Sequence, residues 1–416
     1  HATPIVRMDL LVDAGYAADR EHILGTASLA MNMLDEGAGS MNALEIAEAL
    51  DMLGASVSAG SDVDASVVQL DALTDNLGES MDLYAQIVLN PTFPANELAR
   101  LKQEQLARIK REQSTPVQMA LRVFPQLLYG TDHPYGVPLT GSGTEESVAQ
   151  IERQTLVDFH STWFRPNNAT LVVTGAVTMD QLLPMLEARF GTWEGAGVPA
   201  KPLAEVPQKE ASKVYLIDRP GAEQSIIFAG HVAPPKANPD ELALTALNEA
   251  LGGSFTSRVN MNLREDKGWS YGASTIIFDA KGQRPFFVYA PVQSDKTMES
   301  MQEIQTELTN IRGGSPVTQE ELTKIKASRT LSLPGRWETN DAVANALIEI
   351  VTYGLDDGHY QAYADAVRGL DLDAVRATSS TLQPDRLVWV IVGDRGRIES
   401  SVRELGLGEV EVIEAM

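Results

Sequence analysis

The sequence lacks cysteine entirely, although it is 416 residues long. It can therefore form neither disulfide bonds nor thiolate metal sites, and it gives no indication of its redox compartment. Long apolar runs are also missing. The strongest run, Leu387 to Val392, has the length of a strand and is far shorter than the ~18 apolar residues of a membrane-spanning helix. With 44% hydrophobic and 22% charged residues, the composition is typical of a soluble globular protein.

Positive charge is scarce, since 33 Lys and Arg residues stand against 57 Asp and Glu residues. The resulting net charge of −24 repels nucleic-acid phosphates and anionic membrane surfaces, so nucleic-acid binding is disfavoured. The sequence also contains no G-x-S-x-G, no Walker loop and no G-x-G-x-x-G between a strand and a helix. The stretch TGSGTEES, Thr140–Ser147, fails the dinucleotide spacing and is predicted to be a loop that leads into a helix. Serine hydrolase and nucleotide-binding functions therefore lack support.

The chain is too long for one core, because single cores stop growing at about 250 to 300 residues. Two domains are expected, and an internal repeat supports this division. The helical pattern Pro94–Ile109 resembles Thr318–Leu333, and the next helix ends in LLYG at Gly130 in one half and in VTYG at Gly354 in the other, at the same separation. Each half then closes with a strand that ends in Gly and a following helix. The two halves are predicted to be homologous domains.

A linker is predicted between the halves. The segment Gly195–Lys213 is rich in Pro, Gly, Ala and charged residues and has no apolar period. We place the boundary near residue 205, which gives domains 1–204 and 205–416. Strands at both ends of each half and helices between them predict an α+β fold with helices packed on one sheet face. The chain opens at His1 with neither an initiator Met nor a signal segment, which indicates that a preceding stretch has been removed.

Several segments together resemble the M16 zinc metallopeptidases, a family that includes insulin-degrading enzyme, pitrilysin and the mitochondrial processing peptidase. The resemblance runs over nearly the whole chain and is carried by Gly25–Ala38, Leu89–Lys102, His133–Ser142, Phe159–Val177 and Leu251–Gly272. It implies an α+β fold of two homologous M16 (LuxS/MPP-like) domains. Each domain would be an antiparallel or mixed β-sheet covered by helices, and the pair would form half of a clamshell.

The segment GTASLAMNML, Gly25–Leu34, is predicted to be a buried helix with two polar residues one turn apart. In active M16 members this helix carries H-x-x-E-H, in which two imidazoles bind zinc and the Glu acts as general base on the zinc-bound water. The alignment places Ser28, Met31 and Asn32 at the His, Glu and His positions, and it places Arg108 at the third ligand, a Glu. None of these side chains can replace the original. The resemblance therefore implies a degenerate zinc site, without metal or cofactor in this chain.

The second half retains a different part of the family's site. A half without zinc often carries an Arg and a Tyr that reach a substrate held at the partner's metal, and these positions fall on Arg264 and Tyr271. A Tyr hydroxyl can donate to a developing oxyanion, and an Arg can hold a peptide carbonyl or carboxylate. Just upstream, LGGSFTSR resembles the family's glycine-rich loop, whose missing side chains let a peptide backbone approach. The substrate-binding residues that this implies are Gly252, Gly253, Ser254 and Ser257.

Each of these residues also has an interpretation without chemistry. Ser28 and Asn32 can hydrogen-bond within a packed interface, which we favour, and Arg108 can lie on a solvated helix face. The Gly pair can be a helix C-cap. Tyr271 can be a strand residue with its hydroxyl at a sheet edge, and Arg264 can form an ion pair with the acidic residues beside it. The histidines lack metal-ligand spacing and are predicted to be structural: His22, His133, His160, His231 and His359.

The function that the resemblance implies is that of a non-catalytic subunit, or half, of an M16 zinc metallopeptidase. The chain alone would be inactive. It would complete the peptide-binding chamber and the active site of a partner that carries zinc and an intact H-x-x-E-H helix, and it would contact the substrate carbonyl and oxyanion in trans. Peptides are the implied substrates, and cationic ones are favoured if the negative charge lines the chamber. The resemblance to bacterial two-subunit M16 peptidases implies a periplasmic location.

Two alternatives stay open. The chain can be a structural or scaffold subunit, as M16-like core subunits are in a respiratory complex, although retention of Arg264 and Tyr271 argues against that role. It can also be an autonomous peptide-binding protein that works as a homodimer and needs no zinc-bearing partner. An adjacent reading frame or an in-frame upstream half with H-x-x-E-H would favour the peptidase over both.

Overall fold

The computed structural model describes residues 4–21 and 23–415, so His1 and His22 lie outside the described residues. The chain divides into two compact units. Unit 1 comprises residues 1–110, 141–202 and 334–355, and unit 2 comprises residues 111–140, 203–333 and 356–416. Among the described helices, none combines the length and the apolarity that crossing a bilayer requires.

Unit 1 contains a four-stranded antiparallel sheet in the order β4-β5-β1-β6. Its strands are β1 (Ile5–Val12), β4 (Ser56–Ser61), β5 (Ser66–Leu73) and β6 (Ala169–Gly175), and a short ribbon is formed by β2 (Gly37–Ala38) and β3 (Met41–Asn42). Its helices are α1 (Thr26–Asn32), α2 (Ala43–Leu53), α3 (Leu77–Leu89), α4 (Ala95–Glu112), α6 (Glu145–Gln150), α7 (Arg153–Trp163), α8 (Met179–Phe190) and α13 (Asn340–Tyr353). The apolar run IVRMDLLV forms the central strand β1, which is buried over nearly its full length.

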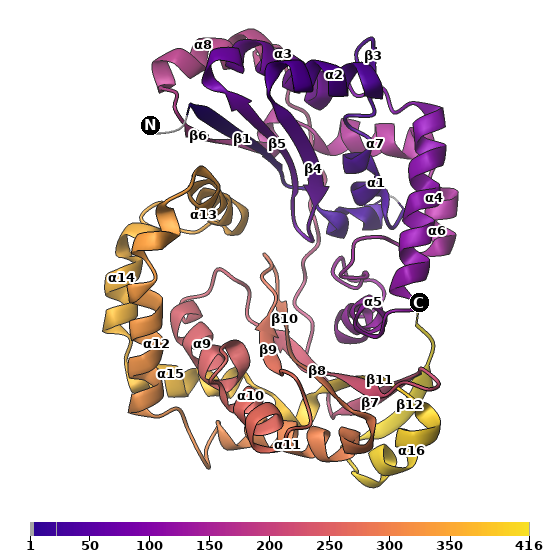
Figure 1. Cartoon of the computed structure of the whole chain (residues 1–416), viewed down its shortest axis with the longest axis vertical. Helices are drawn as coiled ribbons and strands as arrows, with labels where there is room; N and C mark the ends of the chain where they lie inside the picture. Colours follow the sequence, from indigo (N-terminus) through magenta and orange to yellow (C-terminus); the bar gives the residue numbers. More distant parts are fainter. Residues whose placement is uncertain (1–3, 22, 416) are drawn as a thin grey trace. The chain divides into compact units, whose positions relative to one another are not determined.

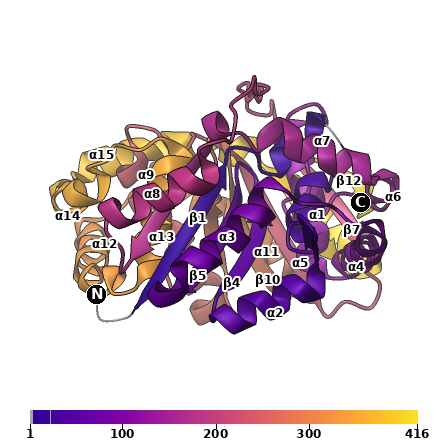
Figure 2. The same ribbon diagram turned by 90° about the horizontal axis from the view of Figure 1, so that it is seen from above.

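Helices cover both faces of the unit 1 sheet. The helices α2, α3 and α8 form a layer on one face, and α13 lies against β1 and β6 on the other (Figure 1). Within the layer, α3 lies between α2 and α8 (Figure 2). The start of α2 is fixed by a capping box, because the Asn42 side chain accepts the Glu45 N–H and the Glu45 carboxylate accepts the Asn42 N–H. Covering both faces explains why β1 is apolar along its length.

Unit 2 contains a six-stranded mixed sheet in the order β12-β7-β11-β8-β10-β9. The pairs β7–β11 and β7–β12 are parallel, and the other pairs are antiparallel. The strands are β7 (Lys213–Asp218), β8 (Gln224–Ala233), β9 (Ser274–Ile277), β10 (Arg284–Gln293), β11 (Val388–Gly393) and β12 (Glu409–Ile413). The helices are α5 (Pro116–Tyr129), α9 (Glu241–Asn248), α10 (Arg258–Asn260), α11 (Thr297–Asn310), α12 (Gln319–Leu331), α14 (His359–Gly369), α15 (Leu372–Ala377) and α16 (Arg395–Glu404). The predicted α+β class, with antiparallel and mixed sheets covered by helices, is confirmed.

Each unit contains one helix from the other half of the sequence. The helix α5 packs on β8 and β11 of unit 2, and α13 packs on β1 and β6 of unit 1. These are the two helices that end in LLYG and VTYG, so the repeat is exchanged symmetrically. The chain also passes from unit 1 to unit 2 between Pro202 and Leu203. The assignment of residues 1–204 and 205–416 as homologous domains stays a prediction, as does the clamshell.

The exchanged helix α13 is joined to β1 by a buried ionic network within unit 1. The Arg7 guanidinium donates to Asp9 through Nε and Nη2, at 2.8 and 3.0 Å, and it donates to Asp341 of α13 through Nη1 at 2.8 Å. Asp9 is fully buried and Arg7 nearly so. A buried charge requires a partner of opposite sign, so the arginine holds both the strand carboxylate and the helix in place.

A buried histidine in unit 2 predicts how stability depends on pH. His231 on β8 is buried, its Nδ1 lies 2.9 Å from the Val232 carbonyl oxygen, and burial lowers its pKa to about 4. The unfolded chain titrates near 6.5, so this residue contributes stability that is fully present above pH 6.5 and is lost as the pH falls toward 4. The expected loss is at most about 3 kcal/mol, from about 1.4 kcal/mol per pKa unit. Urea unfolding at pH 7 and pH 4.5 should show a smaller drop for His231→Gln than for the wild type, and equal drops would contradict the assignment.

Candidate functional site

The helix α1 carries the three positions that align with the zinc motif, and it lies against α7 and the edge strand β4. Ser28 is half-buried and donates its hydroxyl proton to the Gly141 carbonyl, with 2.7 Å between the oxygens. Met31 is buried in the core, whereas Asn32 is exposed. The Ser28 hydroxyl is thus used inside the protein, and the thioether that replaces the general base is covered by other side chains.

A buried carboxylate holds the first turn of α1. Asp19 accepts the Gly25 N–H on Oδ2 at 2.7 Å and the Ala27 N–H on Oδ1 at 2.8 Å. Burial raises the pKa of Asp19 to about 8, and the bonds from the first-turn N–H groups oppose that rise. The first N–H groups of a helix have no partner inside the helix, and the Asp19 carboxylate supplies one. These bonds hold the start of α1 against the segment that precedes it.

The third-ligand position, Arg108, lies on the exposed side of α4. One turn earlier, Gln105 is buried and donates from Nε2 to the Ser142 and Gly25 carbonyls, at 2.8 and 3.3 Å, which brings α4 against the start of α1. A cation on α4 and neutral side chains on α1 supply none of the ligands that zinc requires. Across residues 4–21 and 23–415, no group of three or more His, Asp or Glu side chains could hold a metal ion. These residues therefore do not fit a zinc ion.

The glycine-rich segment of unit 2 begins inside the π-helix η4 (Glu249–Gly253) and leads into α10, which a second π-helix, η5 (Met261–Asp266), follows. A Cβ on Gly252 would lie 2.4 Å from the Thr275 nitrogen of β9, so this position requires glycine for packing within the chain. Gly253 ends η4 and is followed by the extended residue Ser254, as a helix-terminating glycine would be. Contact of these glycines with a substrate backbone stays a prediction.

The two serines of the segment bond within it. The Ser254 hydroxyl donates to the Glu249 carbonyl at 3.2 Å, and the Ser257 hydroxyl donates to the Ser254 carbonyl at 2.5 Å. Ser257 is buried, and its hydroxyl stabilises the turn between Ser254 and Ser257. A hydroxyl that donates one bond can still accept another, so the role of Ser254 and Ser257 in substrate binding stays a prediction.

Arg264 and Tyr271 present their side chains at the surface of unit 2. Tyr271 is 87% exposed, directly before β9. The Arg264 guanidinium lies over the Phe255 ring, 4.6 Å from its centre, and its Nε is 3.3 Å from a Glu265 carboxylate oxygen. Phe255 is itself 60% exposed. A cation stacked on a ring keeps its N–H groups at the ring edge available to an acceptor, so the arrangement can bind a carbonyl or carboxylate.

Buried bonds connect the segments that carry these three side chains. Asn260, buried on α10, donates from Nδ2 to the Phe255 carbonyl at 2.6 Å and accepts the Ala273 N–H on Oδ1 at 3.1 Å. The Leu263 carbonyl accepts the N–H groups of the two residues at 269 and 270, at 2.9 and 3.2 Å. The loop before α10, the helix η5 and the segment before β9 therefore form one bonded group. These bonds fix the backbone positions from which the Arg264 and Tyr271 side chains extend.

A cavity of about 640 Å³ adjoins the same group, between η4, η5, α11 and α12. Two basic residues line it, Arg258 and Lys324. Glu321 pairs with Arg258 through both carboxylate oxygens at 2.8 Å. Further carboxylates line the cavity at Asp266, Glu307 and Glu320. The surroundings of the cavity are therefore acidic.

The described histidines make contacts typical of structural residues. The ring of His160 stacks on Phe164 with 4.5 Å between centroids, and its Nε2 lies 2.8 Å from the Val88 carbonyl. Burial lowers the pKa of His160. His133 stacks on Tyr129 in the predicted HPYG turn, which closes with the Gly136 N–H bonding to the His133 carbonyl at 2.8 Å. That these histidines form no metal site stays a prediction.

Comparison with known protein families gives matches over most of the chain. The model described as insulinase (peptidase family M16) matches residues 1–133, and the model described as the peptidase M16 inactive domain matches residues 150–329. The chain therefore belongs to peptidase family M16, and with the replaced ligand positions it is an M16 protein of the inactive type.

The relatives found by sequence include proteins named as proteases and a protein named as a non-peptidase. An uncharacterized zinc protease of Mycobacterium leprae is 25% identical over 322 residues, which is 76% of this chain and 71% of the relative. A protein of Helicobacter pylori named as a non-peptidase homolog is 24% identical over 383 residues, which is 90% of this chain and 85% of the relative. The chain is thus similar both to a protein named as a protease and to a protein named as a non-peptidase.

Solved structures share the fold. A peptidase M16 inactive domain from Pseudomonas fluorescens superimposes with a TM-score of 0.87 at 24% identity and covers 94% of this chain and 93% of that chain. The periplasmic protease PqqL from Escherichia coli superimposes with a TM-score of 0.75 at 16% identity and covers 99% of this chain but 49% of that chain. The chain therefore matches about half the length of that larger structure.

Two residues of the unit 2 group were not predicted from the sequence. Phe255 is an exposed aromatic residue in a loop of Gly, Ser and Thr, and that contrast is a signal for a contact surface. Asn260 gives no such signal, because an Asn inside a helix can equally point to solvent. Only the bonds that it makes reveal that it joins two segments.

Proposed function

We propose that this chain is the non-catalytic member of an M16 zinc metallopeptidase and that it pairs with a polypeptide bearing zinc and an intact H-x-x-E-H helix. The observation that carries the proposal is the Arg264, Phe255 and Tyr271 group. It presents a cation and a phenol hydroxyl at the surface, on a frame of buried bonds, in a chain whose own zinc positions are filled by Ser28, Met31, Asn32 and Arg108. An exposed group of this kind has no substrate to act on within its own chain.

The roles proposed for the two side chains follow from their chemistry. The Arg264 guanidinium would hold a carbonyl or carboxylate of the peptide, and the Tyr271 hydroxyl would donate to the oxyanion that forms when the zinc-bound water of the partner attacks the scissile carbonyl. The segment Gly252–Ser257 would lie beside the peptide backbone. Zinc is expected only in the partner, and this chain would supply no general base.

Peptides with positive charge are the proposed substrates. Support comes from the net charge of −24 and from the carboxylates around the cavity next to η4 and η5. A periplasmic location is proposed as well, in line with the described location of PqqL, which shares the fold. Cell fractionation of the native host tests the location, and recovery in the cytosolic fraction would reject it.

Assembly with the zinc-bearing partner is the experiment that tests the pairing. Native mass spectrometry of the mixture should show a complex of the two chains with one zinc ion, and the ion should stay with the partner when the chains are separated. The chain alone should carry no stoichiometric zinc. Absence of a mixed complex, or zinc bound stoichiometrically to this chain, would overturn the proposal.

One observation favours a second candidate function, a binding or scaffold role. The H. pylori relative named as a non-peptidase homolog covers 90% of this chain, so a binding or scaffold role without proteolysis is the alternative. In that case the mixed complex would form without hydrolysing peptides, and substitution of Tyr271 would leave every activity unchanged.

A further inference from the structure

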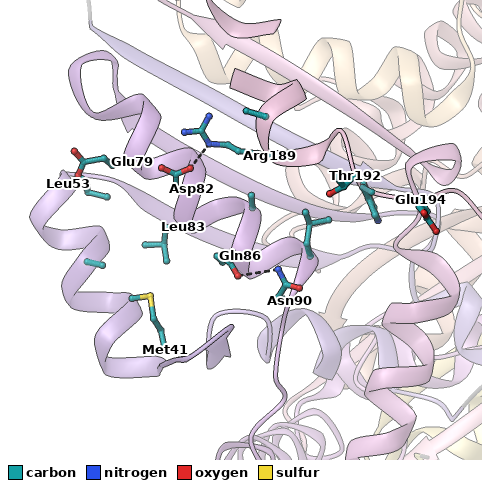
Figure 3. Close-up of a pocket in the computed structure, with 15 residues that line it drawn as sticks. Met41, Leu53, Glu79, Asp82, Leu83, Gln86, Asn90, Arg189, Thr192 and Glu194 are labelled. Carbon is teal, nitrogen blue, oxygen red and sulfur yellow. Dashed lines mark hydrogen bonds and ion pairs between the residues drawn. The ribbon is translucent and has the colours of Figure 1, made fainter. Parts of the chain in front are cut away.

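A groove opens on the layer of helices that covers unit 1, where α2, α3 and α8 meet (Figure 3). Its volume is about 970 Å³. Apolar side chains from three elements line it, namely Met41, Leu53, Leu83 and Leu89. None of its lining residues belongs to the degenerate zinc positions or to the Arg264 and Tyr271 group. The groove is therefore a feature that the proposed peptidase role leaves unexplained.

The three helices around the groove are strongly acidic. They contain seven Asp and Glu residues and a single basic residue, Arg189. Glu79 and Glu194 lie toward opposite ends of the groove, and Asp82 lies between them (Figure 3). A ligand in the groove would meet carboxylates along its length, and these disfavour an anionic ligand.

The single basic residue of these helices, Arg189, bonds to neighbours within the layer. Arg189 donates from Nη1 to the Met185 carbonyl at 2.9 Å and from Nη2 to the Gly78 carbonyl at 2.8 Å, and its Nε lies 2.8 Å from an Asp82 oxygen. The bond to the Gly78 carbonyl and the ion pair with Asp82 join α8 to α3. The Arg189 side chain is 16% exposed, so the guanidinium is not offered to a ligand.

Large apolar side chains are exposed to solvent on α2 and α8. Met52 and Leu44 of α2 are 88% and 67% exposed, and Met179 and Leu183 of α8 are also exposed. Exposed apolar side chains favour contact with another polypeptide, and methionines adapt their shape to a partner. The same layer of helices thus carries exposed apolar side chains and a groove lined by both apolar and acidic residues.

We propose that this groove binds a cationic amphipathic helix of a partner polypeptide. The apolar face of such a helix would fill the groove between Met41 and Leu89, and its Lys or Arg residues would pair with Glu79 and Glu194, since Asp82 is already paired with Arg189. A second copy of this chain carries the same net charge of −24, and an anionic membrane carries the same sign, so both are repelled where a basic helix is attracted. Charge complementarity therefore selects the basic helix as occupant.

The test uses the full chain and a fluorescent synthetic peptide of about 18 residues, with Leu on one face and Lys on the other, long enough to form a helix. Fluorescence anisotropy should show saturable binding, and a peptide of equal charge with Ser in place of Leu should not bind. The double variant Glu79→Lys/Glu194→Lys should weaken binding at least about tenfold, because it reverses the charge at both ends. Met41→Ser, which leaves the charge unchanged, should weaken binding several-fold.

The matched control is Asp357→Lys/Asp373→Lys, which changes the net charge equally at two exposed positions of unit 2. This control should bind the peptide as tightly as the wild type. Equal weakening by the control and the groove variant would show that the chain attracts any cation without a site, and the proposal would fall. It would also fall if the Ser peptide bound as tightly as the Leu peptide. Sedimentation that shows a dimer abolished by Glu79→Lys/Glu194→Lys would assign the groove to a second copy instead.

Discussion

Replacing Tyr271 by Phe is expected to lower kcat for peptide hydrolysis by the assembled enzyme about a hundredfold and to leave KM nearly unchanged. Loss of one preformed donor to an oxyanion typically costs a factor of about 10² to 10³ in kcat. The hydroxyl is the only group removed, and the interaction is made in the transition state, so kcat and kcat/KM should fall together. The exposure of Tyr271 means that folding should be unaffected.

The comparison that isolates this effect is Tyr215→Phe, which removes a phenol hydroxyl from β7 of the same unit. That variant should retain activity within about twofold, because no transition-state contact is lost. Steady-state kinetics with equal amounts of the zinc-bearing partner measure both variants. Full activity of the Tyr271→Phe complex would remove Tyr271 from the site, whatever the fate of the pairing itself.

The second large effect is expected in stability. Arg7→Met should lower the free energy of unfolding by about 3 to 5 kcal/mol, because it leaves the fully buried Asp9 carboxylate without its partner. The bond to Asp341 is lost at the same time, which loosens the exchanged helix α13. Urea unfolding followed by circular dichroism measures the change.

Two further variants separate the buried charge from arginine loss in general. Arg7→Met/Asp9→Leu should recover most of the stability, since replacing a buried ion pair by apolar side chains is often neutral or stabilising. Arg100→Met removes an arginine that pairs with three carboxylates but is 45% exposed, and it should cost less than about 1 kcal/mol. If Arg7→Met and Arg100→Met cost the same, burial of Asp9 does not determine the stability of this network.

The sequence predicts the local elements well because their signals are local. The helix over Thr318–Leu333 appears as α12, and its start is fixed by a capping box in which Thr318 and Glu321 bond to each other's N–H groups. The helix ends at LLYG and VTYG appear at Tyr129 and Tyr353. In the same way, the apolar run at Leu387–Val392 lies in β11 over most of its length.

The exchange of α5 and α13 could not be predicted in this way. An apolar helix face shows that the helix packs against something, but it carries no information on which of two similar sheets receives it. Parallel pairing of β7 with β11 and β12 was likewise not predicted, because strands far apart in sequence have equivalent apolar patterns. The polar network of Arg7 shows the same limit, since its partner Asp341 lies more than 300 residues away.

The helix that carries the aligned zinc positions could be predicted from the sequence, whereas the surroundings of Arg264 and Tyr271 could not. The alignment places Ser28, Met31 and Asn32 on one helix, which the structure shows as α1, and the roles of Arg264 and Tyr271 stay predictions. The ring of Phe255 under the guanidinium and the bonds of Asn260 depend on how a π-helix folds back on β9. A π-helix has no distinct residue pattern, so these contacts appear only in the folded chain.

Peptide hydrolysis is expected to require both chains. Cleavage of a quenched fluorescent peptide by this chain, by the zinc-bearing partner and by their mixture, each with and without chelator, measures this requirement. Cleavage is expected only in the mixture, and chelator should abolish it completely. Cleavage by this chain alone, or an inert mixture that nevertheless forms the complex, would contradict this requirement.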